Sequence, residues 1–461
     1  MGAPVDSAEP PQECVELEQQ LFGLEAGLTG VATVARVRWS SDTPMQTSLV
    51  VTGWRDQTRE TPLEATPATA HEHLLTGLHQ QSSYTIQARG TSPDGTVCSA
   101  EITLETGSLP ASLAPLSADV RAAADDQGYT FTHIISENSL YAAIIDNDGE
   151  YVWAAKVWDR EVDGGGDPGS HAIIFRVMPS PDGTGIIFNT QGERLDETGD
   201  LVHIAWTGEE LSRRSFLAGH TDFVLLPDGG AAMLGWTLRS FGDRTLLGDT
   251  IMVQGPDGDT RVICDAFDHL VPDLGRTYNT GFMPEEGDIE DWSHVNSISH
   301  DAETNELYVT ITANNGVARI DAETGETAWI LSDESDDFDI AAERTVHFPH
   351  SVQRIGDELL VFNRRNPGDT TMCSGAVNIA LDETARTAAE TWRWEGGGCF
   401  HVGFLGNAQR TDEGNTVTSW SHFGVMDEVT PDKDLVWRVS LGIGAAFGFS
   451  HRAPTLAGAP Q

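Results

Sequence analysis

Lysine is scarce in this sequence. The 461 residues contain only two lysines, Lys156 and Lys433, among 27 basic residues, while 71 residues are acidic, so the formal net charge is 27 − 71 = −44. A chain with this charge and no basic run repels phosphate backbones and anionic lipid surfaces, which argues against nucleic acid and membrane surfaces as partners. No run of 18 or more apolar residues is present, so the sequence predicts no membrane-spanning helix.

Cysteine is also rare, because five in 461 residues are too few for a disulfide scaffold. Two pairs, Cys14 with Cys98 and Cys373 with Cys399, are placed so that each could form a bridge, which leaves Cys264. The alternative is that all five are ordinary buried thiols. The first residues lack the charged and apolar regions of a signal peptide and resemble the front of a mature exported chain. A periplasmic or secreted location is therefore an expectation.

Catalytic signatures of several large enzyme classes are missing as well. The sequence contains no GxSxG, CxxC or HExxH motif, so it gives no support to hydrolase, thioredoxin-like or zincin function. What it does contain is glycine, 47 residues of it, together with a hydrophobic content of 39%. This composition is too apolar for a disordered acidic chain and is typical of a turn-rich β protein.

The chain divides into two β regions. Residues 1–13 are polar and proline-rich and are predicted to be a disordered tail. Short alternating runs separated by turns predict a β-sandwich over 14–107, and the stretch 75–95 resembles the end of a fibronectin type III module. Residues 108–124 are predicted to be a linker.

From 125 to 455 the sequence repeats itself. Apolar strands ending in Pro-Asp-Gly or Asp-Glu-Gly turns alternate with hairpins whose far strand carries tryptophan, and this pattern predicts a six-bladed β-propeller. The expected blades lie near 129–165, 171–215, 220–265, 294–335, 347–395 and 401–445, with 446–455 left to close the ring.

Four histidines occur at the starts of predicted innermost strands: His171, His220, His294 and His350. A single histidine at such a position is usually structural. Because the innermost strands of a propeller line its central channel, four in register are expected to converge. Such a cluster suits two chemistries, a transition-metal site with these four residues as ligands or a histidine nucleophile flanked by hydrogen-bond donors.

Several segments resemble the bacterial arylsulfate sulfotransferase family, which consists of six-bladed propellers preceded by a small β-sandwich. The most specific is DWSHVNSI at 291–298, joined by GHTDFVLLPDG at 219–229, HFPHSVQRI at 347–355 and the predicted last blade at 404–441. The likeness covers most of 125–445.

The resemblance implies that a small aromatic sulfate is the substrate and that no cofactor is needed. It implies that His350 is the nucleophile, that His220 and His294 hold the sulfuryl oxygens and protonate the leaving phenolate, and that Asn296 orients the group. Further substrate contacts are expected from the residues beside these positions, namely His171, His347, Trp292, Phe348 and Thr312, with Trp292 and Phe348 as walls of an aryl pocket. Thr312 stands where the family has a sulfuryl-binding arginine.

Three functions from different classes therefore stay open. The first is sulfuryl transfer, which the motifs favour. The second is a metalloenzyme whose transition-metal ligands come from His171, His220, His294 and His350. The third is a propeller that binds a ligand without catalysis. Metal analysis of the purified protein discriminates between the first two, and the sequence carries no sign of an oligomeric state.

Overall fold

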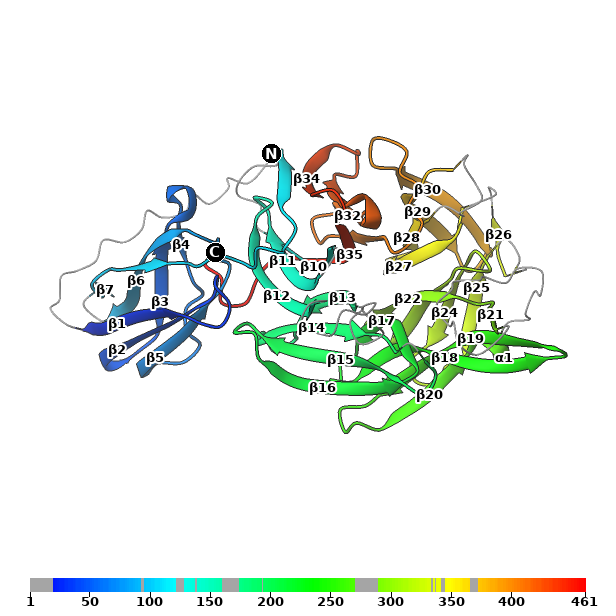
Figure 1. Ribbon diagram of the computed structural model, residues 1–461, viewed down its shortest axis with the longest axis horizontal. Helices are drawn as coiled ribbons and strands as arrows, with labels where there is room; N and C mark the ends of the chain where they lie inside the picture. Colours follow the sequence, from blue (N-terminus) through cyan, green and yellow to red (C-terminus); the bar gives the residue numbers. More distant parts are fainter. Residues whose placement is uncertain are drawn as a thin grey trace.

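The computed structural model describes residues 20–92, 95–121, 128–136, 139–159, 174–192, 194–269, 289–332, 335, 337–340, 345–364 and 372–461. Strands make up nearly all of the regular structure in these residues (Figure 1). The short helical segments among them are α1 (Ala266–His269), η1 (Trp54–Asp56) and η3 (Ser421–Phe423). The predicted tail at 1–13 and the site candidate His171 lie outside the described residues.

The N-terminal region is formed by two sheets that pack around one core (Figure 1, blue). One sheet has the order β1 (Leu21–Leu28), β2 (Ala35–Met45), β5 (Ala68–Leu75). The other has the order β4 (Thr58–Glu60), β3 (Thr47–Thr52), β6 (Ser83–Ser92), β7 (Gly95–Cys98), and β8 (Ile102–Glu105) also pairs with β6. Alternation along β2 explains the packing, because Val37 and Trp39 are buried while Arg38 between them is exposed.

Six further sheets follow in the described part of the chain, antiparallel except where a short strand pairs in parallel at the side of the third and fifth. The first sheet has the order β12 (Tyr151–Asp159), β11 (Ser139–Asp146), β10 (Tyr129–Ser136), β35 (Ala446–Ala453). The second has the order β13 (Ile174–Pro179), β14 (Gly185–Thr190), β15 (Thr198–Ala205), β16 (Glu210–Leu217). The third has the order β17 (Gly219–Leu225), β18 (Ala231–Phe241), β19 (Arg244–Gln254), β20 (Thr260–Asp265), and β21 (Ile289–Asp291) also pairs with β19.

The fourth sheet has the order β22 (Val295–Asp301), β23 (Glu306–Ile311), β24 (Gly316–Asp321), β25 (Thr327–Leu331). The fifth has the order β27 (Pro349–Ile355), β28 (Glu358–Asn363), β29 (Gly375–Asp382), β30 (Thr387–Trp394), β26 (Asp339–Ile340). The sixth has the order β31 (Asn407–Arg410), β32 (Thr416–Ser419), β33 (Val425–Val429), β34 (Leu435–Leu441), β9 (Leu116–Val120). The strands β35, β13, β17, β22, β27 and β31 touch one another in cyclic order. The arrangement is propeller-like (Figure 1).

Both ends of the chain help to close the ring. The late strand β35 pairs with β10, so the first sheet contains residues from the two ends of the propeller-like region. The early strand β9 pairs with β34 of the last sheet, so the predicted linker at 108–124 contains a strand. The chain end returns to the sandwich, where Glu60 and Gln461 exchange two backbone hydrogen bonds.

A buried ion pair ties three inner strands together near the centre of the ring. Arg176 on β13 donates to both oxygens of Asp222 on β17 at 2.6 and 2.8 Å. Asp222 also accepts the backbone N–H of Ile298 on β22 at 3.0 Å. Because every carboxylate oxygen is used, the desolvated charges are compensated and the three strand starts are held in register.

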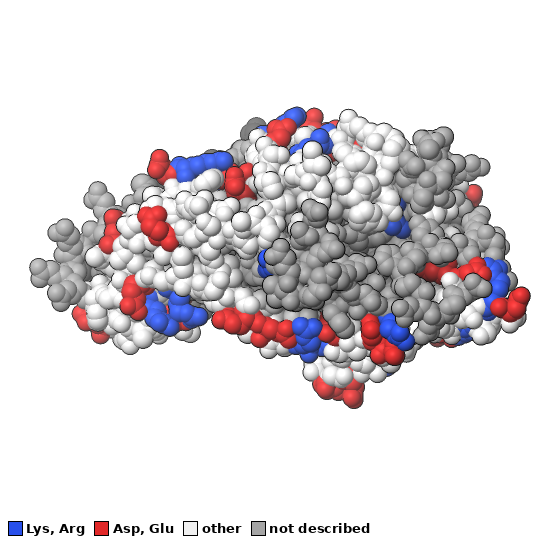
Figure 2. Space-filling model, in the orientation of Figure 1, with Lys and Arg blue, Asp and Glu red and all other residues white. Residues whose placement is uncertain are grey.

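The described surface carries its few basic side chains close to acidic ones (Figure 2). Exposed pairs such as Arg38 with Glu72 at 2.7 Å and Arg239 with Asp268 at 2.9 Å are of this kind. In the part of the chain that the structure describes, no helix has the length and apolar character needed to cross a membrane.

Candidate functional site

A cavity of about 310 Å³ lies where the inner strands β17, β22 and β27 begin. His220, His294 and His350 all line it, so three of the four histidines singled out in the sequence come together. The other described lining residues are Ile135, Leu140, Phe175, Gln191, Thr221, Trp236, Leu247, Asp249, Asp291, Val295, Asn296, Arg364, Phe404 and Leu405.

The strand starts share an unusual backbone that aims these side chains. Thr221, His294 and Phe348 have φ of +50°, +48° and +46°, in the left-handed region that non-glycine residues rarely adopt. Each of these residues lies at a break in strand register. Thr221 lies within the break between His220 and Phe223, and His294 and Phe348 directly precede the breaks between Val295 and Ser297 and between Pro349 and Ser351. A bulge of this kind redirects one side chain without ending the strand.

His350 presents a neutral imidazole to the cavity. Its Nδ1 lies 2.9 Å from the carbonyl oxygen of Gly406, and because a carbonyl can only accept, Nδ1 carries the proton and Nε2 keeps its lone pair. Gly406 has φ of +87°, and a Cβ there would lie 2.4 Å from the Phe362 ring, so glycine is required to present this carbonyl. Burial, and then the charge of Arg364, hold the pKa of His350 well below its usual value.

His294 is paired with a buried carboxylate. Its Nδ1 lies 2.6 Å from Oδ2 of Asp291, three residues earlier in the DWSH segment. Burial raises the pKa of Asp291, although His294 acts in the opposite direction. The pair therefore favours a state in which it holds one proton and has no net charge.

His220 is engaged at both ring nitrogens. Nδ1 lies 2.8 Å from Oγ1 of Thr221, and Nε2 lies 2.9 Å from Oδ1 of Asp249. The ring stacks on Trp236 with the centroids 4.7 Å apart. Both nitrogens thus lie next to protein groups, although the contact of Nε2 with Asp249 is an ion-pair distance without hydrogen-bond geometry.

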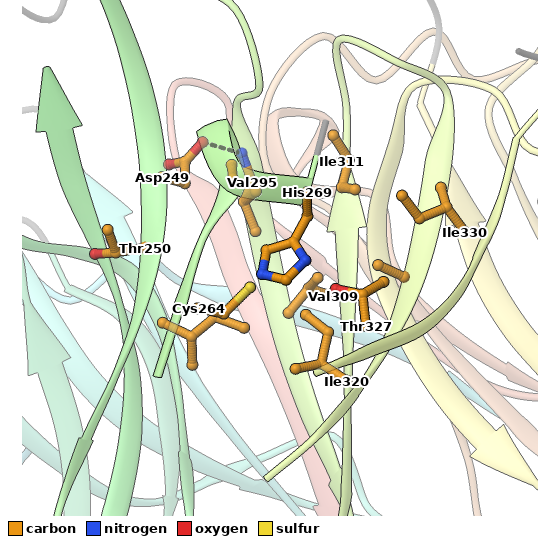
Figure 3. Close-up of a pocket in the computed structure, with 13 residues that line it drawn as sticks. Asp249, Thr250, Cys264, His269, Val295, Val309, Ile311, Ile320, Thr327 and Ile330 are labelled. Atoms are coloured by element: carbon orange, nitrogen blue, oxygen red, sulfur yellow. Dashed lines mark hydrogen bonds between the residues drawn. The ribbon is translucent and has the colours of Figure 1, made fainter. Parts of the chain in front are cut away.

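Asp249 joins the third and fourth sheets behind this histidine. Its Oδ2 accepts Oγ–H of Ser293 at 2.5 Å and the backbone N–H of Val295 at 2.9 Å, the contact drawn in Figure 3. Burial acts to raise the pKa of Asp249, but the hydrogen bonds and His220 outweigh it and lower the pKa. Figure 3 also shows the free, buried Cys264 beside His269 in a small, largely apolar cavity between these sheets.

Asn296 and Thr312 form a linked pair. The amide Nδ2 of Asn296 donates to Oγ1 of Thr312 at 2.6 Å, and Oγ1 of Thr312 donates to the carbonyl of Pro349 at 2.8 Å. Thr312 is fully buried and is not among the described residues lining the cavity. It anchors Asn296 from behind and has no surface to offer a substrate.

The aromatic walls differ from the predicted ones. Trp292 is buried against Leu246 and Phe267 and does not line the cavity. His347 and Phe348 are also outside the described lining, because the left-handed Phe348 turns them away from it. The apolar walls are supplied by other residues: Trp236, Phe175, Leu247, Leu140, Ile135, Phe404 and Leu405.

Sequence reasoning also missed the charged partners of the cavity, Asp249, Asp291 and Arg364. Asp291 lies within the quoted DWSH segment and could have been found from its spacing to His294. Asp249 lies within β19 and Arg364 directly after β28, and no local pattern marks either residue.

The described histidines do not by themselves form a metal site. Among the residues that the structure describes, the only His, Cys, Asp or Glu group with three ligand atoms within 4.8 Å of one another is His79, Asp146 and Asp148, far from this cavity in the sequence. His220, His294 and His350 therefore do not place three ligand atoms at such distances. The predicted fourth ligand, His171, lies outside the described residues.

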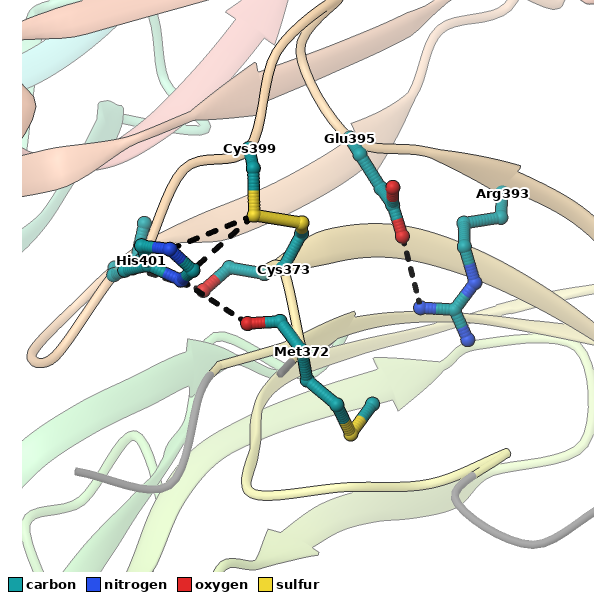
Figure 4. Close-up of a disulfide and its surroundings, with 8 residues drawn as sticks. Met372, Cys373, Arg393, Glu395, Cys399 and His401 are labelled. Atoms are coloured by element: carbon teal, nitrogen blue, oxygen red, sulfur yellow. Dashed lines mark hydrogen bonds and ion pairs between the residues drawn. A yellow bond between two sulfur atoms is a disulfide. The ribbon is translucent and has the colours of Figure 1, made fainter. Parts of the chain in front are cut away.

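A disulfide joins two segments next to the cavity. Cys373 and Cys399 are bonded, with Cα atoms 5.0 Å apart, and Figure 4 shows His401 beside the bridge with Nδ1 3.0 Å from the Met372 carbonyl. One of the two predicted pairs is thus confirmed. Cys98 is also disulfide-bonded, while Cys14 lies outside the described residues.

Comparison with protein families agrees with this architecture. A family model described as arylsulfotransferase (ASST) matches residues 117–436, which is well over half of the chain. The protein is thus an arylsulfotransferase-like member of a propeller class. It belongs to the arylsulfotransferase family, and the predicted family relationship is confirmed. No curated protein matches the sequence.

Solved structures resemble the chain only distantly. A protein of unknown function from Bacteroides caccae is 14% identical, with 69% of this chain and 94% of that chain covered and a TM-score of 0.40. The β-propeller domain of Cps50 from Myceliophteria thermophila is 11% identical, with coverage of 71% and 88% and a TM-score of 0.37. A streptogramin B lyase is 10% identical, with coverage of 71% and 98% and a TM-score of 0.31.

Proposed function

We propose that this protein moves a sulfuryl group from an aryl sulfate to a phenolic acceptor in two steps, with His350 as the carrier. Family membership supports the reaction class. The observation that carries the residue assignment is the imidazole of His350, whose Nδ1 is committed to Gly406 while the ring lines the cavity. A neutral Nε2 lone pair is what attack on sulfur requires.

In the first step, Nε2 of His350 attacks the sulfur. The S–N bond forms, the S–O bond to the aryl group breaks, and its electron pair leaves on the phenolate oxygen. The Asp291–His294 pair gives its proton to that oxygen, and the phenol departs. In the second step, an acceptor phenol returns a proton to the same pair while its oxygen attacks the sulfur. The S–N bond breaks and neutral His350 is regenerated.

Two further residues have positioning roles in this proposal. Asn296 is fixed by Thr312 and orients the sulfuryl group with the rest of its amide. His220 differs from its family-implied role, because both of its nitrogens are already engaged. It forms a wall with Trp236 and holds Asp249 in its ionised form.

We further propose that the six sheets are the six blades of the family's propeller and that the sandwich is fibronectin type III-like, with boundaries near 14–107 and 125–455. The apolar cavity lining supports a small aromatic substrate. The Cys373–Cys399 bridge supports a periplasmic or secreted location, since stable disulfides form in oxidising compartments. The proposed steps need no metal or other cofactor.

The decisive experiment captures the intermediate. The protein is mixed with nitrophenyl sulfate in the absence of acceptor and digested, and we expect one SO3 group on the peptide containing His350. Adding a phenol should discharge it. His350→Gln should remain unlabelled, whereas His300→Gln, near the end of β22 and outside the described cavity lining, should be labelled like the unaltered protein.

Labelling that survives in His350→Gln, or transfer without any labelled peptide, would overturn the proposal. A parallel sample treated with a chelator tests the metalloenzyme alternative. Loss of labelling on chelation and its return with added transition metal would favour that alternative.

A further inference from the structure

Arg364 occupies a position related to that of Thr312, one sheet further along. The backbone N–H of Thr312, just after β23, donates to the carbonyl of His294 at 3.2 Å. The backbone N–H of Arg364, just after β28, donates to the carbonyl of Phe348 at 3.1 Å. His294 and Phe348 are the left-handed residues at the starts of β22 and β27, so the two positions are equivalent.

Their side chains differ in direction. Thr312 is fully buried behind Asn296, while Arg364 lines the cavity and is 5% exposed. The guanidinium is near the backbone of the opposite wall, with Nη1 3.4 Å from the carbonyl of Gly403. The positive charge of Arg364 disfavours protonation of His350 and so contributes to the lowered pKa of the imidazole.

The charges around the cavity show why this arginine matters. Asp249 and Asp291 are each paired with one histidine, so each pair is at best neutral. His350 is neutral, because burial opposes its protonation. Among the described residues that line the cavity there is no other arginine or lysine. An aryl sulfate carries a charge of −1, and without a fixed cation two buried carboxylates would repel it.

We propose that Arg364 binds the sulfuryl oxygens of the substrate and keeps them as the group passes to His350. The proposal rests on the proposed function and deepens it by naming the cation that recognises the anionic ester. The planar guanidinium suits two oxygens of one sulfate, which a lysine ammonium would hold as a point charge only. Arg364 gives up no proton in either step. It lowers the barrier by stabilising negative charge on the oxygens.

Three variants test this assignment. Arg364→Gln removes the charge with little loss of volume, Arg364→Lys keeps the charge but loses the fork, and Arg354→Gln is the matched control. Arg354 lies on β27 of the same sheet, but it faces Asp357 and Glu383 at 3.5 and 3.7 Å and is not among the described residues that line the cavity.

For Arg364→Gln we expect kcat/KM for nitrophenyl sulfate to fall about 100-fold or more. Arg364→Lys should recover part of the loss, and Arg354→Gln should stay within about twofold of the unaltered protein. Calorimetry should show weaker binding of nitrophenyl sulfate to Arg364→Gln but unchanged binding of neutral nitrophenol. The acid limb of the pH profile should move to higher pH, because the His350 imidazole loses a neighbouring positive charge.

Equal weakening of the sulfate ester and the neutral phenol would overturn the proposal, since it would mean a merely structural role. So would turnover within twofold of the unaltered protein. If the unaltered protein transfers sulfuryl but Arg364→Gln is unaffected, only the assignment of Arg364 fails. If the unaltered protein binds aryl sulfates through Arg364 but transfers nothing, the proposed function fails and the anion site remains.

Discussion

Histidines and aspartates meet in two regions of this molecule, with opposite results. At the junction between the sandwich and the first propeller sheet, His79 contacts Asp146 with Nε2 and Oδ2 2.7 Å apart. Trp54 stacks on His79 with the centroids 4.1 Å apart and donates to Asp148 at 2.9 Å. We refer to His79, Asp146, Asp148 and Trp54 as the junction cluster.

Every polar group of the junction cluster is used by a protein neighbour. Nδ1 of His79 lies 3.2 Å from the hydroxyl of Tyr84, and Arg55 pairs with Asp148 at 2.5 Å. The cavity groups are similar in chemistry, but there the rings line a space of about 310 Å³ and His350 turns a lone pair toward it. The same residue types hold two parts of the protein together in one region and line a cavity in the other.

The largest expected effect comes from removing the imidazole of each region in turn. His350→Ala should reduce sulfuryl transfer from nitrophenyl sulfate to a phenol about 10³-fold or more, because the carrier atom is gone. His79→Ala should leave the rate within about twofold. Steady-state assays of both variants, with circular dichroism to verify folding, make the comparison. Equal losses in the two variants would break it.

The next largest effect concerns the carboxylates. Asp291→Asn should lower kcat about 10- to 100-fold, because the pair can no longer hold and return a proton. Asp146→Asn, the junction equivalent, should leave kcat unchanged. The assay should use aryl sulfate donors whose leaving phenols differ in acidity. If the leaving-group dependence of Asp291→Asn matches that of the unaltered protein, the assignment of Asp291–His294 as the proton donor is wrong.

An intermediate effect is expected in the pH dependence of the first step. Burial holds the pKa of His350 well below 6.5, so Nε2 stays unprotonated as the pH falls through 6.5 and the burst rate should stay nearly constant there. An exposed imidazole would lose about tenfold in rate per pH unit below 6.5. Rapid-quench measurement of the first phenol release between pH 5 and pH 8 tells these cases apart. A decline centred at 6.5 contradicts the buried neutral carrier.

The smallest effect on rate, but a measurable one on stability, should follow from the junction cluster. Asp146→Asn leaves His79 with a weakened partner in a mostly buried contact, and we expect the free energy of unfolding to fall by about 1–3 kcal/mol. Denaturant titration followed by tryptophan fluorescence measures this, since Trp54 reports directly on the cluster. His300→Gln is the surface control and should change stability by less than about 0.5 kcal/mol.

Much of the fold could be predicted because the repeat is local. The predicted second to fifth blades begin within three residues of the inner strands β13, β17, β22 and β27, since apolar runs and Pro-Asp-Gly turns specify hairpins by short-range geometry. The strand β9 escaped prediction because only its partner β34, more than 300 residues later, makes it a strand. Tertiary pairing of this kind leaves little trace in the short segment itself.

The site was predictable in part for the same reason. The repeat placed His220, His294 and His350 near the starts of three inner strands, and the three do line one cavity. Register could not say which side chain next to each histidine faces inward, because the left-handed residue and the bulge decide that. Trp292 was therefore predicted as a wall of the cavity, whereas Trp236 forms that wall. The threonine at position 312, where the family has an arginine, gave no hint that Arg364 lines the cavity from the next sheet.

The two-ended closure of the ring has a consequence for biogenesis. Strand β10 leaves the ribosome some three hundred residues before β35, the partner that completes its sheet. At roughly 5–20 residues per second, the nascent chain carries an open ring for most of its synthesis. Of the buried side chains of β35, Phe447 packs in the core between the first and last sheets, and Phe449 contacts Arg176 and His350. The ring around the cavity is therefore completed late in synthesis, when β35 pairs with β10.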